Sequence, residues 1–218
     1  MFTNTKKESE QTTSFASADL ISAELPAAPI STEKLTPDHV PSLLAITSTK
    51  LFTEEECQKI INGCIEELWK PVVVSGNLKL HSADTQRVRG NLESFPFTIF
   101  RDAIIAANTE FYNFSLMGML DNDFPQVAKY SKGDFYNLHS ELNPGLTTRK
   151  LSFLINLNDP SEYEGGEIEF LNTEMDLNAI NVPGTMIVFP SFIAYRIKPV
   201  KKGKKFMITG NIHGDSFK

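Results

Sequence analysis

The most informative stretch of this sequence reads Gln126-Val-Ala-Lys-Tyr130-Ser-Lys-Gly133-Asp-Phe-Tyr136-Asn-Leu-His139-Ser-Glu141. It begins with a short run that is typical of a strand, breaks at Gly133, and continues as a second extended segment. Side chains that lie two residues apart on an extended segment project to the same side. We therefore expect His139 and Glu141 to face one way, about 6.6 Å apart along the chain.

A histidine and a carboxylate on one side of a strand can share a metal ion. Non-haem iron(II) sites use two histidines and one carboxylate on one face of the metal, which leaves other positions open. On its own, however, a His-x-Glu pair is weak evidence, because most such pairs on half-buried strands are structural or incidental. The pair indicates a metal site only where other motifs support it.

Short apolar runs separated by turns make up most of the chain beyond these residues. We expect strands at residues 114–120, 126–131, 150–157, 167–170, 184–189, 194–199 and 205–212. Two helices are expected before them. The first begins at the capping box of Thr53 and Glu56 and continues to Trp69, and the second covers residues 98–111. This order favours a mainly β fold with flanking helices, of the α+β class, as a barrel or a sandwich.

Residues 1–45 differ in composition from the rest of the chain. Twelve of them are Ser or Thr, and only two of the 16 phenylalanines, Phe2 and Phe15, lie there. Such a segment buries too little apolar surface to offset the entropy of ordering it. We therefore expect a low-complexity N-terminal arm at residues 1–45 and a folded domain at residues 46–218. The arm is expected either to be floppy or to be held by a protein partner in an assembly.

Charge and composition exclude several classes of protein. The chain has 21 basic and 27 acidic residues and a net charge of -6, which disfavours nucleic acid as a partner. No apolar run approaches the roughly 20 residues that span a bilayer, so no membrane partner is expected. Lys6 and Lys7 are followed by polar residues, unlike the start of a secretory signal peptide. We expect a soluble protein, located in the cytoplasm or within a particle.

Four further motifs follow the His139 stretch along the chain. They are Arg149-Lys-Leu-Ser152, Asp159-Pro-Ser-Glu-Tyr163-Glu-Gly165-Gly166-Glu167, Phe189-Pro-Ser191 and Pro199-Val-Lys-Lys-Gly203-Lys-Lys205. With these motifs in this order, the chain resembles the iron(II)/2-oxoglutarate dioxygenases, and among them the prolyl-4-hydroxylase-like branch that includes the bacterial PKHD-type hydroxylases. The resemblance covers roughly residues 51–214. It implies a double-stranded β-helix core, also called a jelly roll or cupin-like fold, with supporting helices.

The resemblance also implies three metal-site positions. His139 matches the first iron ligand of the family. Glu141 stands where the family usually has Asp, so its carboxylate extends about 1.5 Å further from the backbone. Tyr195 occupies the position of the distal His, ten residues before the cation at position 205. A phenol with a pKa of about 10 is a poor ligand, and a phenolate beside Glu141 would crowd negative charge around iron(II).

Three more positions match the 2-oxoglutarate pocket of the family. Tyr130 and Asn156 fall where the family lines that pocket. Lys205 stands where the family has an Arg that binds the far carboxylate of 2-oxoglutarate, and it keeps the charge without the bidentate fork. The remaining histidines are not expected to complete the metal site; they are His39, His81 and His213. The last of them is expected to be a surface or packing residue.

Two functions follow from these positions. The altered metal ligands favour a non-catalytic binding or structural module, for example in a large assembly such as a viral particle, that needs no cofactor. The alternative is an active hydroxylase that uses Fe(II) and 2-oxoglutarate on a peptidyl or small-molecule substrate. A protein that binds a different metal ion is a third, less favoured interpretation. The motifs do not identify a substrate.

Overall fold

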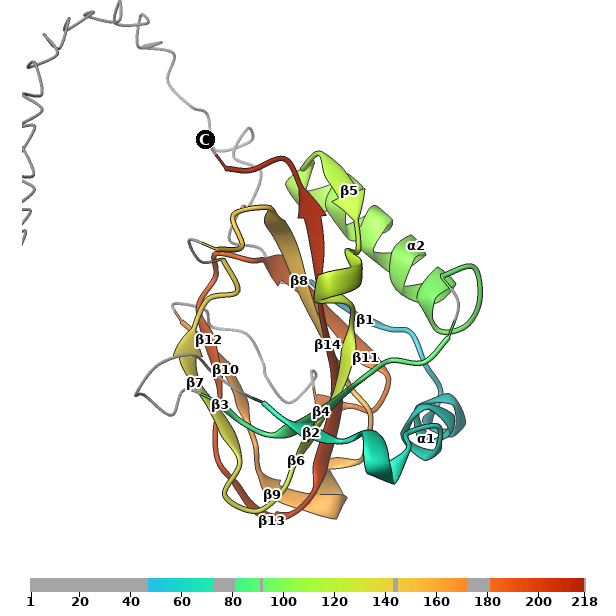
Figure 1. Cartoon of the computed structure of the whole chain (residues 1–218), viewed down its shortest axis with the longest axis vertical. Coiled ribbons are helices and arrows are strands. Elements are labelled where there is room, and N and C mark those ends of the chain that lie inside the picture. Colours follow the sequence, from blue (N-terminus) through green and yellow to red (C-terminus); the bar gives the residue numbers. More distant parts are fainter. Residues whose placement is uncertain (1–46, 73–80, 91, 143–144, 172–180, 218) are drawn as a thin grey trace, which may run out of the picture. The chain divides into compact units, whose positions relative to one another are not determined.

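The structure is a computed structural model that describes residues 47–72, 81–90, 92–142, 145–171 and 181–217. Within these residues the chain forms a large and a small β-sheet with flanking α-helices (Figure 1). The arm predicted for residues 1–45 lies outside the described residues. Its boundary and its protein partner therefore stay predictions.

The large sheet has eight strands, in the order β1-β11-β8-β14-β6-β4-β2, with β5 paired to β14. Its strands are β1 (Thr47–Lys50), β2 (Lys70–Pro71), β4 (Asp84–Arg87), β5 (Leu116–Gly118), β6 (Gln126–Tyr130), β8 (Arg149–Asn156), β11 (Thr185–Pro190) and β14 (Lys205–Gly214). The pairings are antiparallel. β14 comes last in the chain among these strands, yet it lies near the centre of the sheet, between β8 and β6.

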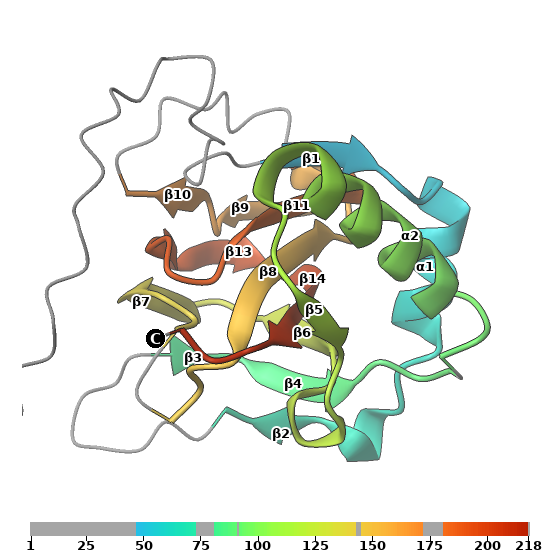
Figure 2. The ribbon, with the colours of Figure 1, turned by 90° about the horizontal axis from the view of Figure 1, so that it is seen from above.

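The small sheet has four strands, in the order β10-β12-β7-β3. They are β3 (His81–Ser82), β7 (Phe135–His139), β10 (Ile168–Phe170) and β12 (Tyr195–Ile197), and a separate pair joins β9 (Tyr163–Gly165) to β13 (Val200–Gly203). The small sheet faces the inner side of the large one (Figures 1 and 2). One buried cluster combines Leu154 and Met207 of the large sheet with Ile168 and Ile197 of the small sheet. The two sheets thus form the predicted jelly roll.

The outer face of the large sheet is covered by helix α2 (Phe97–Ala107) (Figure 2). Phe100 and Ile104 of this helix belong to a second buried cluster with Phe153 and Ile208 of the sheet. The central strands are therefore buried on both faces, which explains their continuous apolar runs. The other helical segments are short. They are a π-helical segment at Asn108–Tyr112 and 3-10 turns at Glu66–Leu68, Asp121–Asp123 and Pro160–Glu162.

Helix α1 (Glu54–Asn62) begins at the predicted capping box. The Thr53 hydroxyl accepts from the Glu56 backbone N–H over 3.2 Å, and the Glu56 carboxylate accepts from the Thr53 N–H over 2.9 Å. The prediction that this helix continues to Trp69 was wrong. Gly63 caps the helix, because its N–H closes the last turn onto backbone carbonyls and the chain then leaves the helix axis.

Each of the predicted strands overlaps a strand of the structure, and the expected extended segment around His139 is strand β7. The sequence did not indicate β1, β2, β3, β4, β9 or β13. These strands are two to four residues long and mostly polar, so they lack the alternation of apolar residues that predicts a strand. Backbone pairing with neighbouring strands, which no local pattern of apolar residues signals, brings them into the sheets.

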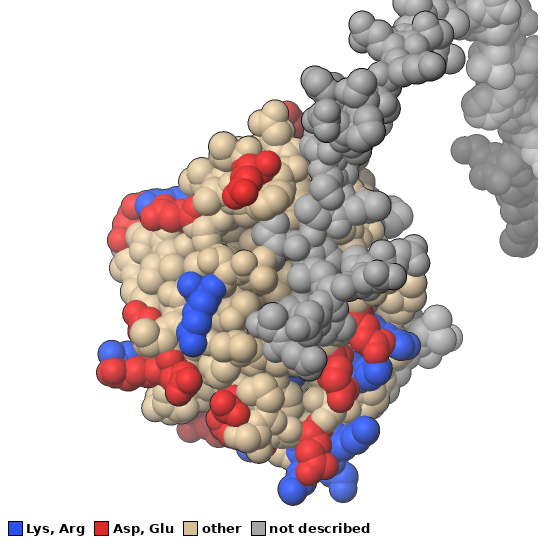
Figure 3. Space-filling view, turned by 180° about the vertical axis from the view of Figure 1, so that it is seen from behind, with Lys and Arg blue, Asp and Glu red and all other residues tan. Residues whose placement is uncertain are grey.

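The surface of the described residues carries charges of both signs. On the face shown in Figure 3, acidic and basic side chains lie next to each other in small groups. Arg196 and Lys198 both pair with Glu169, and Lys202 pairs with Glu164. None of the described helices is long and apolar enough to cross a lipid bilayer.

Candidate functional site

His139 and Tyr195 face each other on neighbouring strands of the small sheet. His139 is the last residue of β7, Tyr195 is the first of β12, and the two are paired in register. Their ring centroids are 4.4 Å apart. Tyr195 is buried because it also packs against Phe170 and Phe189 in the core between the sheets. The fold therefore brings together two of the three positions predicted for the metal.

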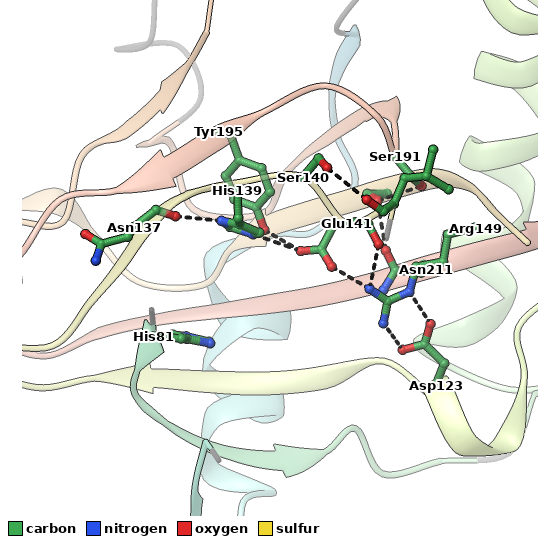
Figure 4. Close-up of polar contacts among 12 residues, drawn as sticks. His81, Asp123, Asn137, His139, Ser140, Glu141, Arg149, Ser191, Tyr195 and Asn211 are labelled. Atoms are coloured by element: carbon green, nitrogen blue, oxygen red, sulfur yellow. Dashed lines mark hydrogen bonds and ion pairs between the residues drawn. The ribbon is translucent and has the colours of Figure 1, made fainter. Parts of the chain in front are cut away.

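Glu141, the third position, follows β7 and turns its carboxylate toward both rings (Figure 4). The Tyr195 hydroxyl donates to Glu141 Oε1 over 2.9 Å, and His139 Nε2 lies 3.2 Å from the same oxygen. His139 Nδ1 donates to the Asn137 carbonyl over 2.7 Å, since a carbonyl can only accept. The contact between Nε2 and Glu141 is a hydrogen bond only when the ring carries both protons.

Arg149, the first residue of β8, binds the other oxygen of Glu141. Its Nη1 donates to Glu141 Oε2 over 2.7 Å and to the Glu141 carbonyl over 3.1 Å. On its other side, Nε and Nη2 each donate to one oxygen of Asp123 over 2.6 Å. One guanidinium therefore joins two carboxylates, as Figure 4 shows.

His213 of β14 extends this network beyond Asp123. Its Nε2 lies 2.9 Å from Asp123 Oδ2, and its Nδ1 lies 2.9 Å from the Thr148 hydroxyl. Of the two roles predicted for His213, surface or packing residue, the second is correct, since only 2% of it is exposed. Asp123, Glu141, Arg149 and His213 are called the Arg149 cluster below.

Two sequence motifs that had no assigned role meet at this cluster. Ser152 of the Arg149-x-x-Ser152 motif donates to the Ser191 hydroxyl of the Phe-Pro-Ser motif over 2.9 Å. The amide nitrogen of Asn211 donates to the Ser152 hydroxyl over 2.8 Å, and its oxygen lies 3.2 Å from Nε and Nη2 of Arg149. Sequence reasoning assigned no role to Arg149 or Asp123, and the Arg-x-x-Ser motif is the signal that pointed to this network.

Both carboxylates of the Arg149 cluster are ionised at neutral pH. Burial acts to raise the pKa of Glu141, but hydrogen bonding and the charges of His139 and Arg149 outweigh it and hold this pKa below its usual value. The pKa of Asp123 is lowered in the same way, since Arg149 and then His213 outweigh the effect of burial. Burial, and next the charge of Glu141, raise the pKa of Tyr195 well above its ordinary value, so its hydroxyl keeps its proton.

The site opens into a cavity of about 570 Å³ between the two sheets. The wall from the small sheet is aromatic, because Tyr136 stacks on His139 with ring centroids 3.4 Å apart and on His81 with centroids 3.8 Å apart. His81 Nε2 lies 2.9 Å from the Tyr130 hydroxyl, and burial lowers the pKa of His81 to about 4. His81 is therefore an uncharged residue in the wall of the cavity at neutral pH. His39 lies outside the described residues.

The three positions predicted for 2-oxoglutarate are buried and do not line this cavity. Lys205 is 0% exposed, and its ammonium donates to the Gly166 carbonyl over 2.9 Å. Burial lowers the pKa of Lys205 to about 8. Tyr130 pairs with Lys205 in register between β6 and β14, and Asn156 donates to the Asn158 carbonyl over 2.8 Å. The protein itself satisfies the polar groups at these positions.

Iron(II) does not fit this arrangement of side chains. An iron site of this kind needs two histidines and one carboxylate, whereas the side chain beside His139 and Glu141 is Tyr195, whose hydroxyl keeps its proton. Both oxygens of Glu141 are already bound, one by Arg149 and one by Tyr195. In the described part of the chain, no group of three or more His, Cys, Asp and Glu residues could hold a metal ion. 2-Oxoglutarate fits no better, because the Lys205 ammonium is enclosed and bonded to a protein carbonyl.

The fold is a jelly roll, and a His-x-acid pair lies at the end of a small-sheet strand beside the cavity. This combination of fold and site is typical of a large class of oxygenases. Residues 125–213 match the 2OG-Fe(II) oxygenase superfamily. This match contains His139, Glu141 and Tyr195, and it agrees with the resemblance that the motifs indicated.

The chain is also similar in sequence to PKHD-type hydroxylases. It is 30% identical over 139 residues to the PKHD-type hydroxylase of Sphingopyxis alaskensis, a match that covers 62% of this chain and 59% of that protein. It is 28% identical over 184 residues to a PKHD-type hydroxylase of Picosynechococcus, covering 81% of this chain and 73% of the relative. In the PKHD-type hydroxylase of Hyphomonas neptunium, only 41% of the protein is covered. The match thus spans about three-fifths of the length of the first of these relatives.

Solved structures show the same fold. A prolyl-4-hydroxylase of Pseudomonas putida superposes with a TM-score of 0.59 at 15% identity, covering 79% of this chain and 94% of that one. A viral collagen prolyl hydroxylase from Paramecium bursaria Chlorella virus-1 gives a TM-score of 0.58 at 18% identity, covering 78% and 96%. At such identities the likeness shows the fold alone.

Proposed function

We propose that this chain is a binding module that uses the oxygenase jelly roll without oxygenase chemistry. The observation that carries the proposal is that both oxygens of Glu141 are bound within the protein, one by Arg149 over 2.7 Å and one by Tyr195 over 2.9 Å. In an iron site the carboxylate and its two histidine neighbours face the metal. Here the carboxylate completes a closed network of hydrogen bonds.

Iron could bind only by drawing Glu141 away from Arg149. The two side chains are 14% and 12% exposed, and breaking a buried ion pair costs about 3–5 kcal/mol. The extra methylene of Glu141, relative to the Asp of the family, extends the carboxylate by about 1.5 Å. This greater reach favours the ion pair with Arg149 over a metal bound close to β7.

The enclosed position of Lys205 supports the same proposal. A 2-oxoglutarate anion would have to displace the Gly166 carbonyl from the ammonium and open a core in which Lys205 is 0% exposed. Burial also makes the ammonium a weaker anion site, because it lowers the pKa of Lys205 to about 8. We therefore expect no cofactor in the native protein.

The partner that we propose is a protein in a larger assembly, such as a viral particle, contacted through the arm of residues 1–45. The Ser- and Thr-rich composition of the arm supports this, because such a segment gains order only against another surface. The described surface, with its groups of mixed charge, gives no support for nucleic acid or a membrane as the partner. A soluble location, in the cytoplasm or within the particle, agrees with this proposal.

An active hydroxylase is the second candidate, and one contact favours it. His139 Nδ1 donates to the Asn137 carbonyl over 2.7 Å, and metal-binding histidines commonly donate their second nitrogen in this way. The relatives named above are hydroxylases. An active protein would need Fe(II) and 2-oxoglutarate, and its substrate would be a peptidyl or small-molecule C–H group.

Anaerobic calorimetric titration with Fe(II), with and without 2-oxoglutarate, separates the two candidates. We expect no saturable binding and no succinate release from the wild-type chain. Tyr195→His tests whether the single missing histidine is what prevents iron binding, and His139→Ala is the matched control that must abolish any binding seen. Tight Fe(II) binding by the wild type, improved by 2-oxoglutarate and accompanied by succinate, would establish the hydroxylase instead.

A further inference from the structure

Strand β1 forms one edge of the large sheet, next to helix α2 (Figure 2). In the described part of the chain β1 pairs with β11 on one side, so the backbone groups on its other side have no strand partner there. A groove of about 720 Å³ lies beside this edge, lined by Ser48 and Thr49 of β1. We call it the β1 groove; its apolar lining consists of Leu51, Ile99, Ala103, Ala106, Ala107 and Phe111.

Two opposite charges lie at the β1 groove. Lys50 is the last residue of β1, and Glu110 lines the groove from the π-helical segment that follows α2. Both residues are exposed, and none of the ion pairs among the described residues involves either of them. A second copy of this chain carries the same two charges, and a two-fold axis presents them in the reverse order. We propose that two copies of the chain pair through antiparallel β1 strands, with Lys50 of each copy against Glu110 of the other.

Contacts of α2 show which end of the groove holds Glu110. The Phe52 and Phe100 rings meet edge to face with centroids 5.8 Å apart, so the first part of α2 lies near the end of β1. The Tyr112 hydroxyl donates over 2.9 Å to the carbonyl of Val188, which is paired with the first residue of β1. The helix therefore runs in the opposite direction to β1, and Glu110 lies toward the start of the strand.

Strand geometry brings Lys50 of the second copy to this same end. Thr49 pairs with Met186, which belongs to the buried cluster beneath α2, so Thr49 is on the α2 side of the sheet. In an antiparallel pair centred between Ser48 and Thr49, Ser48 of the second copy lies opposite Thr49 and projects to the same side. Lys50 of the second copy is two residues further on, so it also projects over the β1 groove, beside the start of β1.

Lys50 and Glu110 also select this register over others. A lysine on an edge strand usually prevents other strands from pairing with it, because the pairing would cover an uncompensated charge. Any other register moves Lys50 of the second copy away from Glu110 and leaves both charges without a partner. The two side chains therefore favour one antiparallel pairing and oppose the alternatives. The β1 groove shares no residue with the cavity of the candidate site, so this inference goes beyond the proposed function.

Sedimentation velocity of the full-length chain over a range of micromolar concentrations tests the inference. We expect a dimer that dissociates on dilution. Lys50→Glu should weaken self-association about tenfold, because the two-fold symmetry creates a like-charge contact at both ends of the interface. Glu110→Lys should weaken it equally. The double variant exchanges the two charges and restores an attractive contact, so it should associate like the wild type.

Lys201→Glu is the matched control, because it makes the same change of charge at an exposed residue of β13, in a different sheet. It should leave self-association unchanged. Ala106→Arg is a further variant that does not depend on charge exchange. Ala106 is an exposed helical residue of the groove, so a long side chain there should prevent dimerisation while the fold is retained. The melting temperature of each variant shows that it is folded.

A wild-type chain that stays monomeric at every concentration overturns the inference. So does a dimer that Lys50→Glu and Glu110→Lys weaken but that the double variant does not restore. A wild-type monomer that dimerises only after Leu43 and Leu44 are replaced by Ser would mean that the chain's own N-terminal arm occupies the groove, which also overturns the inference. None of these measurements uses iron or 2-oxoglutarate, so their outcome is separate from that of the Fe(II) titration.

Discussion

The domain buries two cations, and it surrounds them in opposite ways. Arg149 lies between two ionised carboxylates, and despite burial the bonds to Asp123 and Glu141 raise its pKa further. Lys205 donates to the Gly166 carbonyl and lies 3.4 Å from the Tyr163 hydroxyl, so its hydrogen-bond partners are neutral. Burial lowers the pKa of Lys205 to about 8.

The difference teaches that the partners of a buried cation, rather than its burial, decide whether the charge is retained. At Arg149 the protein supplies the anions itself, so there is no positive charge left for a ligand. At Lys205 the positive charge is not neutralised, but it is enclosed. The two positions thus hold a buried cation in different ways, and each predicts its own response to mutation and pH.

The largest effect is expected from the titration of Lys205. Its pKa of about 8 in the folded chain lies below the ordinary value of 10.5, so between these pH values the unfolded chain holds a proton that the folded chain has lost. Stability therefore rises with pH across this window, by about 3 kcal/mol at most. Urea unfolding on both sides of pH 8 should show this rise for the wild type and not for Lys205→Met.

The exposed Lys201 of β13 provides the matched control. Lys201→Met should show the same rise of stability with pH as the wild type. Burial raises the pKa of Tyr163 to about 12. A tyrosine with a raised pKa lowers the stability of the fold as the pH passes 10, which opposes the rise due to Lys205. The variants are therefore compared below pH 10. An identical pH dependence in Lys205→Met and the wild type would mean that the folded protein does not bury a charged Lys205.

An intermediate effect on stability is expected from removing one tyrosine hydroxyl near each of the two cations. Tyr195→Phe removes a hydrogen bond to the ionised Glu141, which stabilises the fold by about 1.5–3 kcal/mol. Tyr163→Phe removes only longer contacts, 3.4 Å from Lys205 and 3.5 Å from Asn156, so its effect should be about 1 kcal/mol or less. Urea unfolding measures both. Equal losses of stability in the two variants would contradict the contrast between the carboxylates around Arg149 and the neutral partners of Lys205.

The smallest effect is expected far from both cations. Thr53→Ala removes the side chain that caps α1, and loss of an N-cap costs about 1 kcal/mol. This loss should be the same on both sides of pH 8, because no buried charge takes part. If the loss of stability in Thr53→Ala changed with pH, the rise of stability with pH could not be assigned to Lys205 alone.

The sequence predicted the parts of this structure that depend on local patterns or on motifs. The capping box of α1, the long apolar strands β8 and β14, and the meeting of His139, Glu141 and Tyr195 are of this kind. In each case the information lies in a periodic run of residues or in a motif of known order.

The rest depends on contacts between distant residues, which no local pattern encodes. His213 and Asp123 are 90 residues apart, and the pairing of β14 with β8 shifts register between Ile212 and His213. The expectation that His213 lies out of direct reach of the metal position stays a prediction. It could not show that Asp123 and Arg149 connect His213 to Glu141, nor that packing encloses Lys205.

The position of β14 has a consequence for how the chain folds as it is synthesised. β6 and β8 both pair with β14, which follows them by dozens of residues. While residues 205–214 remain in the ribosome, the facing edges of β6 and β8 are unpaired, and Asp123 has not yet met His213. Open strand edges of this kind bind other chains readily. The nascent chain is therefore most exposed to misassembly just before β14 emerges.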